Sequence, residues 1–432
     1  MQRRRHAGRA IPAAPLRPRR LSFVHVALPS ADAAASNETS RIGDTLSIDT
    51  LNSIADLQQL ARRRVPRMFY DYADSGSWSE STYRANEADF AGLLLRQRVA
   101  RDIGGRSLAT TMLGRPVAMP VALAPTGLAG MQHADGEILA ARAACAFGVP
   151  FTLSTMSICS IEEVAAHVDR PFWFQLYVMR DRDFMRRLIA RAKAAQCEAL
   201  VLTLDLQVLG VRHKDVRNGL SAPPKLRLGN IVDIARRPGW WTAMLRTRRR
   251  TFGNIVGHVQ GVSNTGSLSD WISTQFDPHL NWDDVAYIRD LWDGKFIVKG
   301  ILDVEDARLA ASLGVDAVVV SNHGGRQLDG ALSAIAALPP IVDAIGGPTE
   351  VWMDGGIRSG QDILKAVASG ARAAMIGRPF LYGLGAMGEA GVTRCLQILR
   401  DELDRTLALC GHRDILDVDR DTLVNPRRLG AH

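Results

Sequence analysis

Short apolar runs recur between residues 117 and 377, and each is followed by a stretch in which apolar positions have helical spacing. Short bounded apolar runs predict buried strands, whereas apolar positions at i, i+3 and i+4 predict amphipathic helices. The predicted strands are residues 117–124, 151–153, 172–177, 199–203, 296–299, 317–321, 349–353 and 373–377. The predicted helices are residues 135–147, 160–167, 181–195, 282–292, 304–313, 333–345, 359–368 and 381–409. This alternation predicts an α/β protein with a (β/α)8 TIM barrel.

Three segments lie outside the alternation. Residues 48–63 and 67–74 have helical patterns, which predict an N-terminal helical extension. Residues 206–280 separate the fourth strand from its helix, so we expect a long insertion there. Residues 1–45 are rich in Arg, Ala, Pro and Ser without lasting periodicity, which predicts a disordered leader before a barrel domain at 46–425.

Charge and cysteine usage exclude several classes of protein. The net charge of +8 is concentrated in the first 31 residues and in residues 210–260, so the rest of the chain is net acidic. This distribution argues against a nucleic-acid-binding protein or a non-catalytic basic binding protein. The five cysteines are scattered, which argues against a metal site or a disulfide framework. No apolar run is long enough to span a membrane.

Polar groups follow nearly every predicted strand, and the carboxyl ends of the strands form the catalytic rim of such a barrel. Residues 321–330, Ser-Asn-His-Gly-Gly-Arg-Gln-Leu-Asp-Gly, are the most informative of these strand ends. His323 can accept a proton and Arg326 can bind an anion, a combination that suits a carboxylate substrate that must lose a proton. A simple polar loop is the alternative, but the matching polar groups at the other strand ends favour a site.

The last two strand ends predict a phosphate site. Gly355 and Gly356 precede a helix that begins near Ser359, and Gly377-Arg378 follows the next strand. Each pair alone is typical of a simple turn. On the seventh and eighth strands of a barrel, however, backbone amides, a helix N-terminus and arginines can converge on one anion.

From residue 51 to 425 the chain resembles the FMN-dependent α-hydroxy-acid oxidoreductases, which include glycolate oxidase, L-lactate dehydrogenase and mandelate dehydrogenase. Residues 321–329 carry the most specific part of the resemblance, and the supporting motifs are residues 70–72, 124–127, 174–177, 298–301 and 354–356. The resemblance implies FMN as cofactor and the oxidation of a small L-2-hydroxy acid to the 2-oxo acid. It also implies a quinone or another respiratory electron acceptor and a homo-oligomer, most commonly a tetramer.

The resemblance assigns roles residue by residue. His323 is the expected catalytic base and Asp205 its carboxylate partner, which would favour the charged imidazole that forms as a proton is taken. The expected substrate ligands are Tyr72, Tyr177, Arg212 and Arg326. The expected contacts of the flavin ring and ribityl chain are Pro125, Thr126, Gly127, Ser154, Gln175, Thr203, Lys299 and Ser321. The expected ligands of the phosphate end are Asp354, Gly356, Arg358, Gly377 and Arg378. Whether the Cα proton or the hydroxyl proton leaves is open at this point.

Departures from the family pattern leave the substrate and the acceptor open. Met156 stands near the position at which plant-type oxidases have Trp, and Gly127 stands where many oxidases have Ala. We expect a different pocket wall, with L-lactate as the first candidate and mandelate as the second. A soluble oxidase that uses oxygen is a further alternative. Another FMN-binding or phosphate-binding barrel, such as an isomerase, would not need His323 together with Arg326 and Tyr72.

The insertion places aromatic residues and cations side by side, in residues 236–241 (Arg-Arg-Pro-Gly-Trp-Trp) and 244–246 (Met-Leu-Arg). This pattern is typical of a segment that lies on an anionic membrane surface, although a solvated loop over the active site is the alternative. Similar segments occur in bacterial family members that reduce membrane quinones. We therefore expect a cytoplasmic protein attached peripherally to the inner face of the cell membrane.

Overall fold

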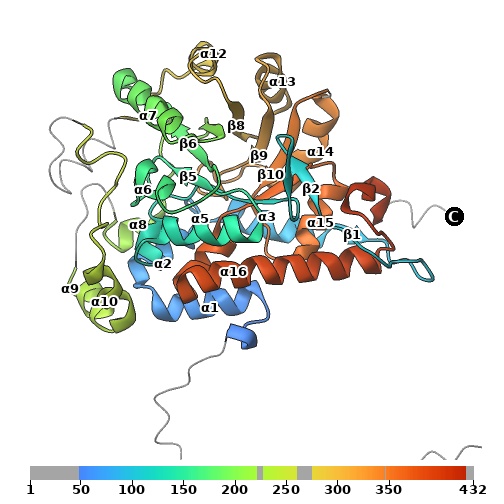
Figure 1. Ribbon diagram of the computed structural model, residues 1–432, viewed down its shortest axis with the longest axis horizontal. Coiled ribbons are helices and arrows are strands. Elements are labelled where there is room, and N and C mark those ends of the chain that lie inside the picture. The colour runs from blue at the N-terminus through green and yellow to red at the C-terminus, as the bar shows by residue number, and fades with distance from the viewer. Residues whose placement is uncertain (1–47, 221–226, 260–274, 346, 425–432) are drawn as a thin grey trace, which may run out of the picture. The chain divides into compact units, whose positions relative to one another are not determined.

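The computed structural model describes residues 48–220, 227–259, 275–345 and 347–424, and its centre is an eight-stranded parallel barrel (Figure 1). The strands are β4 (Val121–Leu123), β5 (Thr152–Ser154), β6 (Trp173–Tyr177), β7 (Ala199–Thr203), β8 (Lys295–Ile301), β9 (Ala317–Ser321), β10 (Glu350–Asp354) and β11 (Ala373–Ile376). They pair in the order β4-β11-β10-β9-β8-β7-β6-β5, and a bridge between Leu123 and Phe151 closes the barrel. The predicted (β/α)8 fold is confirmed.

Helices follow the strands and pack on the outside of the barrel. They are α4 (Ala129–Gln132), α5 (Gly136–Phe147), α6 (Ile161–Ala165), α7 (Arg182–Ala194), α12 (Trp282–Asp290), α13 (Val304–Ser312), α14 (Ala334–Ala344), α15 (Gly360–Ala368) and α16 (Arg378–Leu409). Ser160, Asn281 and Ser359 begin α6, α12 and α15 with capping boxes, in which the third helical residue bonds back to the cap. Local sequence therefore determines where these helices begin.

The N-terminal extension reaches the carboxyl rim of the barrel. It consists of η1 (Ile48–Thr50), α1 (Ile54–Arg64), α2 (Arg67–Ala73) and α3 (Ser81–Ala91). Leu57, Leu60 and Ala61 form the buried stripe of α1, which lies along α16 (Figure 1). β1 (Leu94–Leu95) pairs with β12 (Leu423–Val424), close to η2 (Ile415–Asp417) and η3 (Arg420–Thr422) in the sequence.

Side chains fill the amino end of the barrel, so the open space lies at the carboxyl end. At the amino end, Trp173 on β6 and Trp352 on β10 stack with their ring centroids 5.2 Å apart. A hairpin of β2 (Thr110–Met112) and β3 (Arg115–Val117) contributes to this inner cluster through Met112 and Val117. The packed layers match the usual interior of this fold, which is a core and not a pore.

Two predicted boundaries are wrong. The run predicted as one strand at 117–124 is divided, because Val117 pairs with Thr110 in the hairpin and the barrel strand begins at Val121, after Pro120. Proline lacks the N–H that a continuous ladder needs. The helix predicted at 381–409 begins earlier, at Arg378, and kinks at Met387 and Gly388, where the dihedral angles are not helical.

The insertion after β7 contains α8 (His213–Arg217), α9 (Leu228–Ala235) and α10 (Pro238–Arg246). α9 and α10 lie to one side of the barrel (Figure 1). No helix in the described part of the chain has the length and apolar character needed to cross a membrane. The predicted leader at 1–45 lies outside the described residues.

Candidate active site

A cavity of about 730 Å³ opens at the carboxyl ends of the strands. Fifteen of the nineteen predicted site residues line it. The other four lie behind the lining and bond to predicted site residues: Asp205, Ser154, Gln175 and Ser321. The structure thus brings the predicted residues together at one rim of the barrel, while the role of each residue stays a prediction.

His323 and Asp205 form a hydrogen-bonded pair at the edge of the cavity. The Nδ1 atom of His323 lies 2.8 Å from Oδ1 of Asp205. His323 follows β9 with φ +57°, and its backbone N–H donates to the Ser321 hydroxyl at 3.1 Å. Gly300 on β8 leaves room for the carboxylate, because a Cβ there would lie 2.6 Å from Cγ of Asp205.

Asp205 is held in its ionised form. Burial raises the pKa of Asp205, but the nearby His323 and Lys299 outweigh burial and leave the pKa below its ordinary value. An ionised carboxylate accepts a hydrogen bond from the Nδ1–H group, which leaves Nε2 of His323 as the ring atom with a free lone pair. The pair can therefore take a proton from a ligand in the cavity.

Two guanidinium groups stack on the Tyr72 ring, with the Cζ atoms of Arg326 and Arg212 4.8 and 5.4 Å from its centroid. Arg212 donates to Oδ2 of Asp215 at 2.5 Å, whereas Arg326 has no carboxylate within 4.0 Å among the described residues. Burial, followed by the charge of Arg212, lowers the pKa of Arg326 to about 10. Close, incompletely compensated cations favour the binding of an anion.

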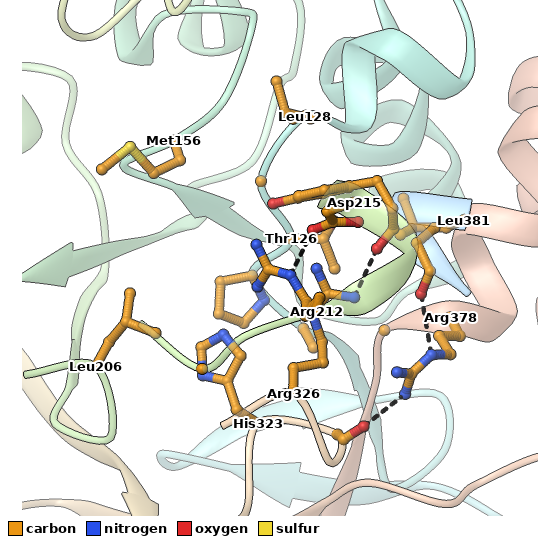
Figure 2. A pocket seen from close by; sticks show the side chains of 18 of the residues that line it. Thr126, Leu128, Met156, Leu206, Arg212, Asp215, His323, Arg326, Arg378 and Leu381 are labelled. Atoms are coloured by element: carbon orange, nitrogen blue, oxygen red, sulfur yellow. Dashed lines mark hydrogen bonds and ion pairs between the residues drawn. The ribbon is translucent and has the colours of Figure 1, made fainter. Parts of the chain in front are cut away.

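Figure 2 shows His323, Arg212 and Arg326 converging on the cavity, with Met156 and Leu206 to one side of them. Tyr177 also lines the cavity, and burial together with Asp205 raises the pKa of its phenol, so the hydroxyl stays a hydrogen-bond donor. The cavity therefore presents a proton acceptor and several donors to one small anion.

Lys299, Ser321 and Asp354 form a second buried cluster on β8, β9 and β10. The Lys299 ammonium lies 2.6 Å from Oδ2 of Asp354 and donates to the Ser321 hydroxyl at 2.8 Å. Asp354, which we expected at the phosphate end, thus forms an ion pair with Lys299 in this structure. Its contact with a phosphate stays a prediction.

Two buried donors beside this cluster have no partner among the described residues: the amide nitrogen of Gln175 and the hydroxyl of Thr203. The other amide atom of Gln175 accepts from Ser154 at 3.1 Å. A buried polar atom without a partner costs free energy, so the Thr203 hydroxyl in the lining and the Gln175 amide behind it mark the place of a polar ligand. They fit the carbonyl and nitrogen edge of a planar ring system.

The predicted phosphate end lies between α15 and α16. Gly356 has φ +84°, and a Cβ there would lie 2.0 Å from the carbonyl oxygen of Asn86, so no larger residue fits. Gly377, the N-cap of α16, has no side chain to cap the helix, which leaves the first backbone N–H groups open to an anion. Arg358 and Arg378 line the same end of the cavity.

Two functional contacts were missed by sequence reasoning. Asp215 pairs with Arg212, and its position three residues later on α8 was a usable signal. Asn86 exchanges two side-chain hydrogen bonds with Asn322 at 2.9 and 2.8 Å, which fixes the loop that carries His323. Asn86 lies within α3, and nothing in the local sequence indicates that contact.

The fold and the site define a barrel enzyme that presents a histidine and two arginines beside an anion-binding rim. The chain belongs to the FMN-dependent dehydrogenase family, whose model matches residues 61–425. The L-lactate dehydrogenase of Caulobacter vibrioides is 46% identical over 375 residues, which cover 87% of this chain and 98% of that protein. The L-lactate dehydrogenase of Ectopseudomonas mendocina is 43% identical over 378 residues, which cover 87% of this chain and 100% of that protein.

A solved structure of the monotopic membrane protein (S)-mandelate dehydrogenase is also similar, with a TM-score of 0.83 and 37% identity. The match covers 87% of this chain and 100% of that chain. The predicted family, its barrel fold and its dependence on FMN are therefore confirmed.

Proposed function

We propose that this protein oxidises L-lactate to the 2-oxo acid, with FMN as cofactor and His323 as the base. The carrying observation is the placement of the His323–Asp205 pair and the guanidinium groups of Arg212 and Arg326 at one cavity. The L-lactate dehydrogenases at 43–46% identity support the choice of substrate. A carboxylate held beside a proton acceptor is the arrangement that a 2-hydroxy acid requires.

The residues around the cavity fit FMN. Gln175 and Thr203 offer unpartnered buried donors to the ring, and Lys299 adds a positive charge beside them. Gly356, Gly377, Arg358 and Arg378 would hold the phosphate, and Pro125, Thr126, Gly127 and Ser154 would contact the ring or the ribityl chain. Bound FMN supplies the two-electron acceptor for the oxidation.

The chain's own groups would orient the substrate and move its proton. Arg326 and Arg212 would bind the carboxylate, and the hydroxyls of Tyr72 and Tyr177 would donate to the substrate oxygens. Nε2 of His323 would then take the proton, while ionised Asp205 stabilises the imidazolium that results. Removing one of these groups should therefore slow the chemical step or weaken binding, according to its part.

(S)-Mandelate is the second candidate substrate. Met156, Leu206, Leu209 and Phe276 form an apolar part of the lining, which is larger than the methyl group of lactate needs. The similarity to (S)-mandelate dehydrogenase points to the same candidate. The size of the pocket wall and not the carboxylate site would decide between the two substrates.

Anaerobic reduction tests both candidates. The purified protein should be yellow, and L-lactate should bleach it in the absence of oxygen, whereas D-lactate should not. Faster bleaching by (S)-mandelate than by L-lactate would replace the first candidate by the second. A protein that stays oxidised with every 2-hydroxy acid of a panel would contradict the proposed reaction.

We further infer that the electron acceptor is a membrane quinone and that α9 and α10 attach the protein to the inner face of the cell membrane. Leu228, Ile231 and Leu245 are 83, 54 and 63% exposed on these helices. Arg236 and Arg246 are exposed on the same segment, which combines apolar anchors with cations. Trp240 links the segment to the cavity, since it stacks on Phe69, a lining residue, at 5.4 Å.

The acceptor and the oligomeric state have separate tests. Reduced protein that reoxidises rapidly with a quinone analogue and slowly with oxygen would support a dehydrogenase, and the reverse would make it an oxidase. A homotetramer is proposed from the family resemblance, and light scattering of the purified protein measures it directly. Val208 and Leu328 are exposed apolar residues on the segments that follow β7 and β9, and they support contact with a second copy.

A further inference from the structure

Asp74 collects hydrogen-bond donors from four helices. Tyr382 on α16 and Tyr83 on α3 donate to its Oδ1 at 2.7 and 3.0 Å. Tyr70 on α2 and Gln58 on α1 donate to its Oδ2 at 3.1 and 3.5 Å. A carboxylate that accepts from this many donors is held in one position.

The negative charge of Asp74 suits its surroundings. Burial raises the pKa of Asp74, but the Tyr382 hydrogen bond and the charge of Arg378 outweigh burial and lower the pKa below its ordinary value. The carboxylate is therefore ionised at neutral pH and accepts from every donor around it. An amide at this position would turn one of its two atoms into a donor, facing phenols that donate.

The backbone around Asp74 holds the two arginines that we assign to ligands. Arg326 donates through Nη1 to the carbonyl oxygens of Tyr72 and Ser75 at 2.6 and 3.0 Å. Arg378 donates to the carbonyl oxygens of Ala73 and Ser75 at 3.0 and 2.8 Å. The Ser75 carbonyl is shared, so one turn fixes both guanidinium groups.

We propose that Asp74 is the positioning residue of this turn, which sets the substrate arginine Arg326 and the phosphate arginine Arg378 together. Asp74 does not line the cavity and acts only through residues 72–75. The assignment rests on the proposed function for the ligand that each arginine binds. Its consequence is that loss of the Asp74 carboxylate weakens the binding of the FMN phosphate and of the hydroxy acid at the same time.

A merely structural role would have a different effect. If Asp74 only joined the four helices, its replacement would loosen the whole site, including the ring contacts of the flavin. If it acts through Arg378, the loss is confined to the phosphate. Riboflavin, which has the same ring without the phosphate, separates the two cases.

The test compares Asp74→Asn with Asp71→Asn, a matched control three residues earlier in α2. The Asp71 carboxylate bonds Asn218 and Arg67 and has no bond to Arg326 or Arg378. FMN release from the full-length holoenzyme is followed by flavin fluorescence, and FMN and riboflavin are then titrated back. KM for L-lactate is measured with saturating FMN. We expect Asp74→Asn to raise Kd for FMN and KM about tenfold or more, the effect of one lost buried hydrogen bond, and to leave Kd for riboflavin within about twofold of wild type.

Equal losses of FMN and riboflavin affinity, or unchanged Kd for FMN and KM, would overturn the proposal. The Asp71→Asn control should match wild type in each measurement. If Asp74→Asn does not fold, Tyr382→Phe decides, because it removes a single donor and keeps the ring. It should weaken FMN binding and not riboflavin binding, and equal affinity of this variant and wild type for FMN would overturn the proposal. Wild-type bleaching by L-lactate is measured independently, so failure of the proposed reaction is distinguishable from failure of the positioning role.

Discussion

His323 adopts a backbone conformation that few residues other than glycine adopt. Its φ of +57° crowds Cβ against the backbone, at a cost of about 1–3 kcal/mol. The conformation is maintained by the bond of its N–H to Ser321 and by the Asp205 contact at Nδ1. A strained residue that the surroundings hold in place is a common feature of active sites. In this conformation the His323 side chain lines the cavity while its Nδ1 atom stays bonded to Asp205.

His323→Gln should retain FMN and lose flavin reduction. Glutamine keeps a polar side chain of similar reach but cannot take a proton, so the rate of reduction by L-lactate should fall by about 100-fold or more. Anaerobic stopped-flow absorbance measures the rate, and the flavin spectrum verifies that FMN is bound. Near-normal reduction would remove His323 from the role of base.

Arg326→Lys should raise KM for L-lactate by about tenfold or more, because lysine keeps the charge and loses the planar fork. In the structure one guanidinium nitrogen already bonds the turn at Tyr72 and Ser75, which leaves the others for a ligand. The ammonium group of lysine cannot bond the turn carbonyls and bind the substrate carboxylate through two parallel hydrogen bonds at the same time. Steady-state kinetics measure the change, and Arg217→Lys, an exposed position on α8, serves as the control. Equal KM values for Arg326→Lys and wild type would place the carboxylate elsewhere.

Asp205 should make stability depend on pH in the acid range. Its folded-state pKa is lowered, so its contribution is present above the unfolded value of about 3.9 and is lost as the pH falls through the folded value. The difference in free energy of unfolding between wild type and Asp205→Asn should be constant near neutral pH and should shrink below about pH 4. Urea denaturation of the holoenzyme over a pH series measures it. A difference that grows on acidification would contradict the assigned direction.

The helices and strands that depend on the local pattern of apolar residues could be predicted from the sequence. Apolar runs such as residues 199–203 and 317–321 coincide with barrel strands, and the polar residues that follow them meet at one rim. Contacts between distant segments could not be predicted, because no local sequence pattern indicates them. Tyr382 bonds Asp74 across 308 positions, and the division of residues 117–124 depends on a hairpin partner at Thr110.

The exposed apolar residues of α9 should be needed for membrane binding. Replacing Leu228 and Ile231 by Glu should release the protein from vesicles that contain anionic phosphatidylglycerol. The change removes the exposed apolar side chains that would enter the membrane and adds charge repulsion. Cosedimentation measures binding, and flavin reduction by L-lactate should be unchanged. Leu309→Glu on α13, where the side chain is 40% exposed, is the matched control. Wild-type protein that stays in the supernatant at low salt would contradict membrane attachment.

At the scale of the whole molecule, FMN binding should stabilise the folded state. Gln175 and Thr203 leave buried donors without partners, and a bound flavin would satisfy them. Added FMN in about 100-fold excess over Kd should stabilise the folded state by about 2.7 kcal/mol, and Tm should rise with FMN concentration. Scanning fluorimetry of the full-length protein measures Tm. Unchanged Tm across an FMN series above the protein concentration would show that the flavin does not bind this state.

The turn at residues 72–75 also imposes an order on biosynthesis. Its partners Arg326, Arg378 and Tyr382 are translated long after it, since they lie 254, 303 and 308 positions beyond the groups that they bond. While the ribosome is still making the eighth barrel strand, the turn lacks Arg378 and the Tyr382 phenol of α16, which both follow that strand. A nascent chain at that stage lacks the arginine that we assign to the phosphate, so we expect it to bind FMN only after the start of α16 has been made.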